Sequence, residues 1–427
     1  MDKLLGDARR LGWTSSLAIL QRNLRLYGWR STLRKLARRF IAVDSLYRHH
    51  AASLQRQGIA AVDAAADVFG APCVLIAGAL DLPQCKKYRV LQKVEFCENA
   101  GWPCHYTSYT DEIRALGYLQ IATTLILYRV PAGAQFDIYL AEARRLGVQV
   151  LYDIDDPIFD HAVYRENPNL DYIAPTEKDA ILDSVALYRN AMSQVDGLIF
   201  STTFLAELGR QQFSAPVFVW RNLVDAATLS AAEHLDLSQS RDDRPGAPLV
   251  IAYCSGSRAH EEDFRVASPA LLALMKQCDH VVLRVIGHAT LPDDFSRFGQ
   301  RVELRPFSSY PQYMEALASA DLCIVPLVAD RFNACKSAIR YLEAALCGVP
   351  VVASRVGQFE DIINNGVNGV LVTADAAQWQ RTLAELIADG TQRDALAEAA
   401  RNDVLAAQRV ISANVVDAEL IDRLTVV

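Results

Sequence analysis

The stretch from Asp321 to Thr373 constrains the fold more than any other part of this 427-residue chain. Short apolar runs alternate there with amphipathic segments, which predicts strand, loop, helix, strand, loop, helix and strand in that order. Leu322–Leu327 and Val349–Ala353 are apolar throughout, as is typical of strands buried on both faces of a parallel sheet. The helix between them is predicted to begin near Ser337, a favourable N-cap residue, and to end before Gly348. The stretch therefore indicates an α/β protein.

The polar side of that helix carries residues suited to ligand binding. Lys336, Arg340, Glu343 and Cys347 are spaced by four, three and four positions, so they form one stripe. Lys336 is expected at the helix N-terminus, where backbone N–H groups and the macrodipole favour an anion. Glu343 lies two turns further and can accept hydrogen bonds from sugar hydroxyls. This combination suits a nucleoside diphosphate, although an ordinary crossover helix with a solvated polar side explains the spacing equally well.

From Pro72 onwards strands and helices alternate, beginning with the strand 73–79. Residues 81–88 are predicted to be a loop, and 88–101 a helix. Alternation of this kind argues for parallel sheets covered by helices on both faces. Ligands of such sheets bind at the carboxyl ends of the strands, so polar residues at those ends are candidate site residues.

Polar residues follow two neighbouring strands of the first predicted sheet. Asp153, Asp155 and Asp156 come directly after a buried strand, and burial of unpaired charge is too costly for them to be core residues. We therefore expect all three to face the ligand. Metal binding, hydrogen bonding to substrate hydroxyls and an N-cap role are the interpretations of this cluster. Tyr128 and Arg129 end another strand, where Arg129 either meets a substrate phosphate or pairs with the aspartates.

A short turn of small residues follows the first strand of the second predicted sheet. Ser255, Gly256 and Ser257 come almost immediately after the strand 249–253. Small residues let the backbone approach a phosphate, and serine hydroxyls can donate to it. Arg258 adds a positive charge. Because a helix is predicted to follow, this turn is a candidate phosphate-binding segment.

Several of these residues belong to a longer pattern that resembles a known family. The pattern consists of Asn333, Lys336, Ser337, Glu343, Gly348, Pro350, Ser354, Gly357, Gly366, Asn368, Gly369, Leu371 and Val372. It resembles the donor-binding half of group 1 glycosyltransferases, and more narrowly the branch found in bacterial surface-polysaccharide clusters. The resemblance covers about residues 70–410 and is strongest over 249–372. It implies the GT-B fold, in which two Rossmann-like domains face a cleft, and a retaining reaction with a nucleotide-diphosphate sugar.

The resemblance also assigns roles to individual donor-side residues. The family usually has two glutamates eight residues apart, and Glu343 aligns with the second, which binds ribose. Cys335 stands at the first position, so Asn333 or Lys336 is expected to take over its sugar contact. Phe307 lies near the backbone that holds the nucleobase in similar enzymes, where it would stack or pack against the base.

Similar enzymes carry the segment Asp153-Ile154-Asp155-Asp156 and need no metal or other cofactor, which favours hydrogen bonding to acceptor hydroxyls or assistance at the reacting centre. The residues expected to carry the chemistry are therefore Asp153, Asp155, Asp156, Lys336 and Arg258, with Ser255, Gly256, Ser257, Phe307, Asn333, Ser337 and Glu343 binding the donor and Tyr128 and Arg129 binding the acceptor.

Domain limits follow from the resemblance and from a polar segment that ends in Pro and Gly. The predicted units are a basic helical extension (1–70), an N-terminal Rossmann-like acceptor domain (71–227), a linker (228–247), a C-terminal Rossmann-like donor domain (248–405), and a C-terminal helix that crosses back to the N-domain (406–427).

The charge of the chain is unevenly distributed. Residues 1–60 hold 12 Lys and Arg against 3 Asp and Glu, a balance of +9, so the remaining residues carry −16 and the net charge is −7. No nucleic-acid-binding motif accompanies the basic segment, which favours an anionic membrane surface as its partner; packing on the catalytic body and a dimer contact are the alternatives. The nine cysteines show no CxxC pair or metal-ligand spacing, which indicates free thiols in a reducing compartment. We therefore expect a cytoplasmic protein, peripheral at the inner membrane face if the basic helices bind there.

The sequence predicts a glycosyltransferase that moves a sugar from a nucleotide-diphosphate sugar to a saccharide acceptor, with a lipid-linked saccharide favoured by the basic helices. Two alternatives come from other classes. A dinucleotide-binding oxidoreductase would need a GxGxxG turn, which the sequence lacks. A catalytically silent relative, acting as a sugar-binding or partner subunit, is favoured by Cys335 and opposed by Lys336 and Glu343.

Overall fold

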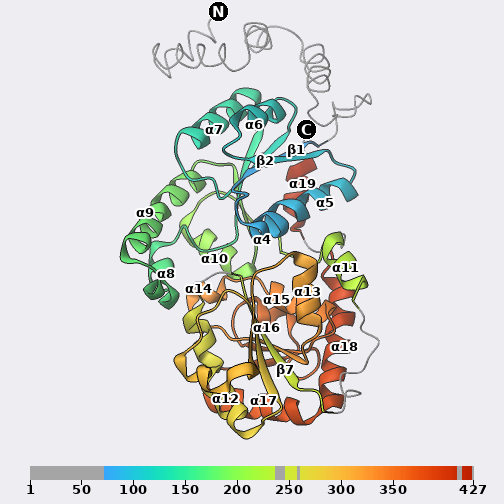
Figure 1. Ribbon diagram of the computed structural model, residues 1–427. Helices are drawn as coiled ribbons and strands as arrows, with labels where there is room; N and C mark the ends of the chain where they lie inside the picture. The colour runs from blue at the N-terminus through green and yellow to red at the C-terminus, as the bar shows by residue number, and fades with distance from the viewer. Residues whose placement is uncertain (1–71, 236–245, 257–259, 411–415, 426–427) are drawn as a thin grey trace, which may run out of the picture.

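The computed structural model describes residues 72–235, 246–256, 260–410 and 416–425. The predicted basic helices within 1–70 lie outside these residues, and so do Ser257 and Arg258. The described chain forms two units, one above the other in Figure 1, and each contains a six-stranded sheet whose strands all pair in parallel. The predicted α/β class with two Rossmann-like units is therefore confirmed.

The N-terminal sheet has the strand order β2-β1-β3-β4-β5-β6. Its strands are β1 (Val74–Gly78), β2 (Cys104–Ser108), β3 (Thr124–Tyr128), β4 (Gln149–Ile154), β5 (Gly197–Phe200) and β6 (Val217–Val219). The helical segments around it are α4 (Pro83–Cys85), the π-helix η1 (Lys86–Leu91), α5 (Gln92–Asn99), α6 (Glu112–Leu119), α7 (Ala134–Leu146), α8 (His161–Arg165), the 3₁₀ helix η2 (Pro168–Tyr172), α9 (Pro175–Met192), α10 (Thr203–Gln212) and α11 (Ala226–Glu233).

The C-terminal sheet has the strand order β12-β11-β10-β7-β8-β9. Its strands are β7 (Leu249–Ser255), β8 (Val281–Gly287), β9 (Val302–Arg305), β10 (Leu322–Val325), β11 (Val351–Ser354) and β12 (Val370–Val372). Its helical segments are α12 (Glu261–Gln277), η4 (Asp293–Arg301), α13 (Tyr310–Ala318), α14 (Arg331–Ala334), α15 (Ile339–Leu346), α16 (Gln358–Ile362), α17 (Ala376–Ala388) and α18 (Gly390–Ala407), and α19 (Ala418–Thr425) follows.

Burial on both faces explains the apolar runs that the sequence shows. Every residue of β1, β3 and β7 is buried. Alternate side chains of a strand point to opposite faces, so Leu75 and Ile76 enter two different apolar clusters on the two sides of the N-terminal sheet. Helices cover both faces of each sheet as a result, which leaves the strand ends and the loops that follow them as the places where ligands can bind.

The segment that follows β1 differs from its prediction. The sequence predicts a loop over 81–88, but α4 begins at Pro83 and continues into the π-helix η1. Proline is tolerated in the first turn of a helix, because the N–H that it lacks would have no intrahelical partner there. The π-helix buries Tyr88 and Arg89, the first against the C-terminal unit and the second within the N-terminal core. π-Helical turns are frequent at functional sites.

The chain returns to the N-terminal unit at its end. Trp220 forms an antiparallel bridge with Val416, and the backbone N–H of Val219 donates to Asp417 Oδ2 at 2.7 Å. Leu420 of α19 belongs to the apolar cluster around β1, and Figure 1 shows α19 beside α5. Helix α11 occupies the start of the predicted linker 228–247, and 236–245 lie outside the described residues. In the part of the chain that the structure describes, no helix is both long and apolar enough to cross a bilayer.

Candidate donor and acceptor site between the two units

The loops at the carboxyl ends of the C-terminal strands contact the N-terminal unit. Gly256, at the end of β7, lies against Gln84, whose Nε2 is 3.5 Å from the Gly256 carbonyl oxygen. A Cβ at Gly256 would lie 2.9 Å from Gln84 Nε2 and 3.2 Å from an Arg340 nitrogen, so the ends of these two side chains lie close to the Gly256 backbone. Ser255 is buried beside it. Two of the residues predicted to cradle phosphate thus lie at the junction of the units.

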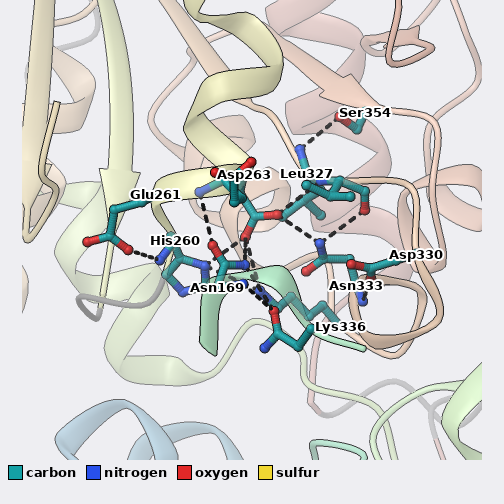
Figure 2. Close-up of polar contacts among 12 residues, drawn as sticks. Asn169, His260, Glu261, Asp263, Leu327, Asp330, Asn333, Lys336 and Ser354 are labelled. Atoms are coloured by element: carbon teal, nitrogen blue, oxygen red, sulfur yellow. Dashed lines mark hydrogen bonds and ion pairs between the residues drawn. The ribbon is translucent and has the colours of Figure 1, made fainter. Parts of the chain in front are cut away.

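Asp263 is the centre of the polar network at this junction (Figure 2). Its Oδ1 accepts from the Val328 backbone N–H at 3.0 Å and from Asn333 Nδ2 at 2.8 Å. Its Oδ2 accepts from Asn169 Nδ2 of η2 at 3.2 Å, which is a contact across the two units. The side chain is only 1% exposed. Although burial opposes ionisation, the hydrogen bond from His260 and the charge of Lys336 lower the pKa of Asp263 to about 2.

Lys336 and His260 lie together on the exposed side of this carboxylate. Lys336 Nζ is 3.6 Å from Asp263 Oδ2 and 3.3 Å from His260 Nδ1. The Lys336 side chain is 18% exposed, so its ammonium is only partly neutralised and remains open to an anion. Helix α15 begins at Ile339 with Ala338 as its N-cap, one residue after the predicted cap Ser337. Lys336 therefore belongs to the loop before the helix, so helical spacing does not decide how it lies relative to Arg340.

Ser337 has a structural partner in place of the predicted cap. Asn222 Nδ2 donates to Ser337 Oγ at 2.9 Å, and Asn222 Oδ1 accepts from Arg89 at 2.8 Å. Asn222 lies in the segment that joins β6 to α11. Ser337 is therefore linked through Asn222 to the buried core of the N-terminal unit, which fixes the loop that carries Lys336.

Glu343 is buried, with 2% of its side chain exposed, and its oxygens are held by protein groups. Tyr88 Oη of η1 donates to Oε1 at 2.5 Å, while Tyr313 Oη and Arg340 Nη1 each donate to Oε2 at 2.7 Å. Burial and the Glu343 charge raise the pKa of the Tyr88 hydroxyl, so it remains a donor. The structure therefore places a side chain of the N-terminal unit on the carboxylate that was predicted to bind ribose.

The position where a glutamate was expected, Cys335, directly follows α14, and both pack against the N-terminal unit. Cys335 is fully buried and belongs with Phe332 to the apolar cluster of the N-terminal sheet. Phe332 lies against Tyr164 at a ring-centroid distance of 5.4 Å, and Thr202 Oγ1 donates to the Cys335 carbonyl oxygen at 3.1 Å. Burial raises the pKa of the Cys335 thiol. This position therefore stabilises the contact between the units and cannot present a carboxylate to a sugar.

We expect Cys335→Glu to destabilise the protein, because the carboxylate would enter an apolar contact without a partner. Burial of an unpaired polar or charged group costs ~2 kcal/mol or more, whereas Cys335→Ser should cost about 1 kcal/mol. Thermal denaturation followed by circular dichroism measures the difference. A Glu variant as stable as the Ser variant would show that the position is accessible to solvent and that the apolar contact is not formed.

Asn333 is also more enclosed than predicted. It is fully buried, and its Nδ2 is used by Asp263 and by the Val328 carbonyl at 3.0 Å. Its Oδ1 has no partner among the residues that the structure describes. Any sugar contact of Asn333 is thus limited to that oxygen.

The prediction that all three clustered aspartates face the ligand is wrong for Asp153. It is fully buried and ion-paired with Arg89 of η1 and, at 2.6 Å, with Lys93 Nζ of α5. Burial of a carboxylate is tolerated here because two cations compensate its charge. Burial and the Arg89 charge lower the pKa of Lys93 to about 8. Asp153 therefore holds η1 and α5 against β4.

Asp155 and Asp156 are partly exposed, with 14% and 32% of their side chains exposed, and they share one arginine. Arg129 Nε donates to Asp155 Oδ1 at 2.6 Å, its Nη2 pairs with Asp156, and Tyr128 Oη donates to Asp155 at 3.1 Å. Although burial opposes it, the charge of Arg129 lowers the pKa of Asp155. Arg129 has a φ of 49°, the one positive value of a non-glycine residue in the described chain. Strain of this kind persists where the surroundings impose it, and it is common at ligand sites.

Phe307 is exposed and stacks on His288 with a ring-centroid distance of 6.0 Å and an interplanar angle of 5°. The two residues follow β9 and β8, so the pair lies at the carboxyl edge of the C-terminal sheet. At the same edge, a Cβ on Gly287 would lie 2.0 Å from the Ser255 carbonyl oxygen, so the close approach of the ends of β7 and β8 requires glycine at this position. This aromatic surface is open to a planar ligand.

Several side chains of the site had no role in the sequence analysis. Among them are Tyr88, Arg89, Asn169 and Tyr313. The basic and aromatic run 86–89 is the one sequence signal that points to any of them, because the partners are far away in the chain. Within the described ranges, no group of three or more His, Cys, Asp or Glu side chains is arranged to hold a metal ion.

Comparison with known proteins is most informative for the C-terminal unit. Residues 248–389 match the family model described as glycosyl transferases group 1. D-inositol 3-phosphate glycosyltransferase of Salinispora arenicola is 42% identical over 84 residues, which cover 19% of this chain and 18% of that protein. D-inositol 3-phosphate glycosyltransferase 1 of Catenulispora acidiphila is 33% identical over 99 residues, 23% of this chain and 22% of that one. The chain thus spans about a fifth of the length of these curated relatives.

Solved structures resemble the chain over both units. Anabaena Alr3699/HepE in complex with UDP and glucose has a TM-score of 0.56 at 14% identity, covering 83% of this chain and 99% of that one. Sucrose-phosphate synthase of Thermosynechococcus elongatus has a TM-score of 0.53 at 16% identity, with 79% and 95% covered. At these identities the likeness establishes the fold, which is GT-B, and leaves the ligands of this chain to be argued from its own site.

Proposed function

We propose that the protein transfers a glycosyl group from a nucleotide-diphosphate sugar to a saccharide hydroxyl, and the match of residues 248–389 to the family model described as glycosyl transferases group 1 supports this proposal. The observation that carries the proposal is the partly exposed ammonium of Lys336, which lies beside His260 at the junction of the two Rossmann-like units of the GT-B fold. The solved relative Alr3699/HepE was crystallised with UDP-glucose, which supports a sugar nucleotide as the donor.

The donor-side residues suit the parts of such a substrate. Lys336, with Ser255 and Gly256, would bind the diphosphate, and the Phe307–His288 pair would stack on the base. Glu343 would bind ribose through Oε1, in place of the hydrogen bond from Tyr88 Oη. Ser257 and Arg258 remain predicted phosphate contacts outside the described residues. In the reaction, the bond between the anomeric carbon and the phosphate oxygen breaks as the acceptor oxygen bonds to that carbon. A preorganised cation stabilises the negative charge that develops on the departing diphosphate.

The acceptor side and the stereochemical course are further parts of the proposal. Arg129, Asp155, Asp156 and Tyr128 lie together at the end of β3 and β4, where they would meet the acceptor. We propose a retaining reaction, in which the acceptor attacks from the face of the departing phosphate and gives its proton to a phosphate oxygen. A lipid-linked saccharide in cell-surface polysaccharide synthesis, reached through the basic residues 1–60 at the cytoplasmic membrane face, is the acceptor that the charge distribution supports.

The test is calorimetric binding of UDP, GDP and dTDP to the full chain, followed by hydrolysis of the matching nucleotide sugars without an acceptor. We expect one nucleotide to bind clearly, because base contacts select among the three, and its sugar derivatives to be hydrolysed slowly. Absence of binding by all three would rule out the diphosphate site.

A catalytically silent relative remains the second candidate, because Cys335 is buried where a sugar-binding glutamate was expected and Asp153 is buried in an ion cluster. The same experiment separates the two. A silent protein would bind a nucleotide or a saccharide but hydrolyse none of the nucleotide sugars.

Tyr88→Phe is expected to tighten nucleotide binding about threefold to tenfold, because Tyr88 Oη and a ribose hydroxyl would compete for Glu343 Oε1. Removal of the phenol hydroxyl frees an acceptor whose hydrogen bond is worth ~1 kcal/mol. Isothermal titration calorimetry of the selected nucleotide measures the change. Tyr172→Phe is the matched control, because Tyr172 Oη also donates across the two units, to Glu262, without touching Glu343. If both variants tighten binding equally, loosening of the contact between the units is the cause.

A further inference from the structure

His260 lies where the start of α12 meets the loop after α14. It is the N-cap residue of α12, and its ring lies between Asp263 of the same helix and Lys336 from the loop after α14 (Figure 2). Its Nδ1 is 3.0 Å from Asp263 Oδ2 and 3.3 Å from Lys336 Nζ. The imidazole is 27% exposed, whereas the carboxylate behind it is 1% exposed. A histidine held in this way can present its other ring nitrogen to a ligand.

The neighbours of Nδ1 decide which ring nitrogen carries the proton. Asp263 is already the acceptor for Val328 N–H and Asn333 Nδ2, and its low pKa keeps it ionised. An ionised carboxylate only accepts hydrogen bonds, so Nδ1 donates its proton to Asp263. The ammonium of Lys336 is itself a donor and therefore lies near Nδ1 without a hydrogen bond to it.

The surrounding charges favour the neutral imidazole. Burial and the positive charge of Lys336 lower the pKa of His260, and Arg340 of α15 acts in the same direction. Asp263 opposes this shift, and Glu261 on α12 accepts from the His260 backbone N–H at 3.0 Å. The net direction is downward, so the ring is neutral near pH 7, with a proton on Nδ1 and a lone pair on Nε2.

A lone pair on Nε2 selects the chemistry of the ligand. It repels phosphate oxygens and accepts hydrogen bonds from hydroxyl groups, and among the described residues no group donates to it. We propose that His260 Nε2 accepts a hydrogen bond from a hydroxyl of the donor sugar, next to the diphosphate bound by Lys336. This inference rests on the proposed function. Asp263 is the positioning residue that fixes this tautomer.

The test removes Nε2 alone. In His260→Asn the amide nitrogen still donates to Asp263, but the second ring nitrogen is lost. We expect kcat/KM for hydrolysis of the donor without acceptor to fall about tenfold, the worth of one hydrogen bond. Affinity for the free nucleoside diphosphate, which has no sugar, should stay within twofold. His260→Gln, whose Oε1 can replace Nε2, should recover part of the loss. His234→Asn is the matched control, because His234 is exposed on the end of α11.

A pH profile tests the positioning role of Asp263. Protonated imidazole has no lone pair on Nε2, so kcat/KM for donor hydrolysis should fall as the pH drops through the His260 pKa. Because the Asp263 charge raises that pKa, Asp263→Asn should move this acidic limb to lower pH. A purely structural role of Asp263 would lower activity at every pH without moving the limb. In His260→Asn the limb should disappear.

The possible outcomes separate this inference from the proposed function. The inference alone would be overturned if the wild-type protein hydrolyses the donor but Asp263→Asn leaves the acidic limb at the same pH. It would also be overturned if His260→Asn leaves kcat/KM unchanged. A parallel loss of nucleotide affinity in His260→Asn would place the residue on the phosphates and also overturn it. A wild-type protein that neither binds nucleotides nor hydrolyses their sugars would overturn the proposed function and this inference with it.

Discussion

Replacement of Lys336 by alanine is expected to weaken binding of the nucleoside diphosphate tenfold to a hundredfold. A hydrogen bond to a charged group is worth about 1.5–3 kcal/mol. Removal of the Lys336 ammonium would also leave Asp263, which is 1% exposed and ionised, without its neighbouring cation. The Asp263 charge would then repel the incoming phosphates. Donor hydrolysis should fall further, about a hundredfold to a thousandfold, since the lost charge acts on the departing diphosphate.

Calorimetry of the selected nucleotide and steady-state hydrolysis measure these two effects. Lys276→Ala is the control, because Lys276 is exposed in the last turn of α12. Lys336→Arg tests whether charge alone is sufficient. Unchanged affinity in Lys336→Ala would show that the ammonium is only a partner of Asp263 and would remove the main support for the diphosphate site.

Replacement of Asp153 by asparagine is expected to lower the free energy of unfolding by about 3–5 kcal/mol, the usual cost of breaking a buried ion pair. The variant would leave the charges of Arg89 and Lys93 buried without their carboxylate, since both side chains are at most 1% exposed. Urea denaturation at pH 7 measures the loss.

Two further variants define the cause of this loss. Asp156→Asn should change stability by at most about 1 kcal/mol, because its carboxylate is 32% exposed. The double variant Asp153→Asn, Lys93→Met should recover part of the stability by removing one unpaired charge. If Asp153→Asn is as stable as wild type but loses donor hydrolysis, Asp153 acts in the chemistry, as the sequence alone had indicated.

The regular elements were largely predictable, because their causes are local. Buried strands appear as apolar runs such as Leu322–Val325, and Gly348 takes the left-handed conformation that ends α15, with a φ of 65°. The start of α15 was less predictable, because Ser337 is a good cap in isolation but uses its hydroxyl for Asn222. Local preference was overridden there by a partner 115 residues away.

The site itself depends on such distant partners. The sequence placed Asp153, Asp155 and Asp156 together, yet the structure buries the first because Arg89, 64 residues away, reaches it from η1. Asp263 meets Asn169 across 94 residues, and Glu343 meets Tyr88 across 255. No spacing rule reports pairs of this kind, since they arise only when distant parts of the chain fold together, within one unit for Asp153 and Arg89 and between the two units for the other pairs.

The sequence by itself determined the alternation of strands and helices, the parallel sheets and the segments that end at the ligand-binding edge. These follow from hydrophobic periodicity and from turn and cap residues, which act over a few positions. Only the tertiary structure decided which polar groups at that edge are free. The cost of burying an unpaired charge assigns Asp153 and Glu343 to protein partners. The same cost favours the partial exposure of the Lys336 ammonium, which lies with the neutral His260 beside the buried Asp263 carboxylate.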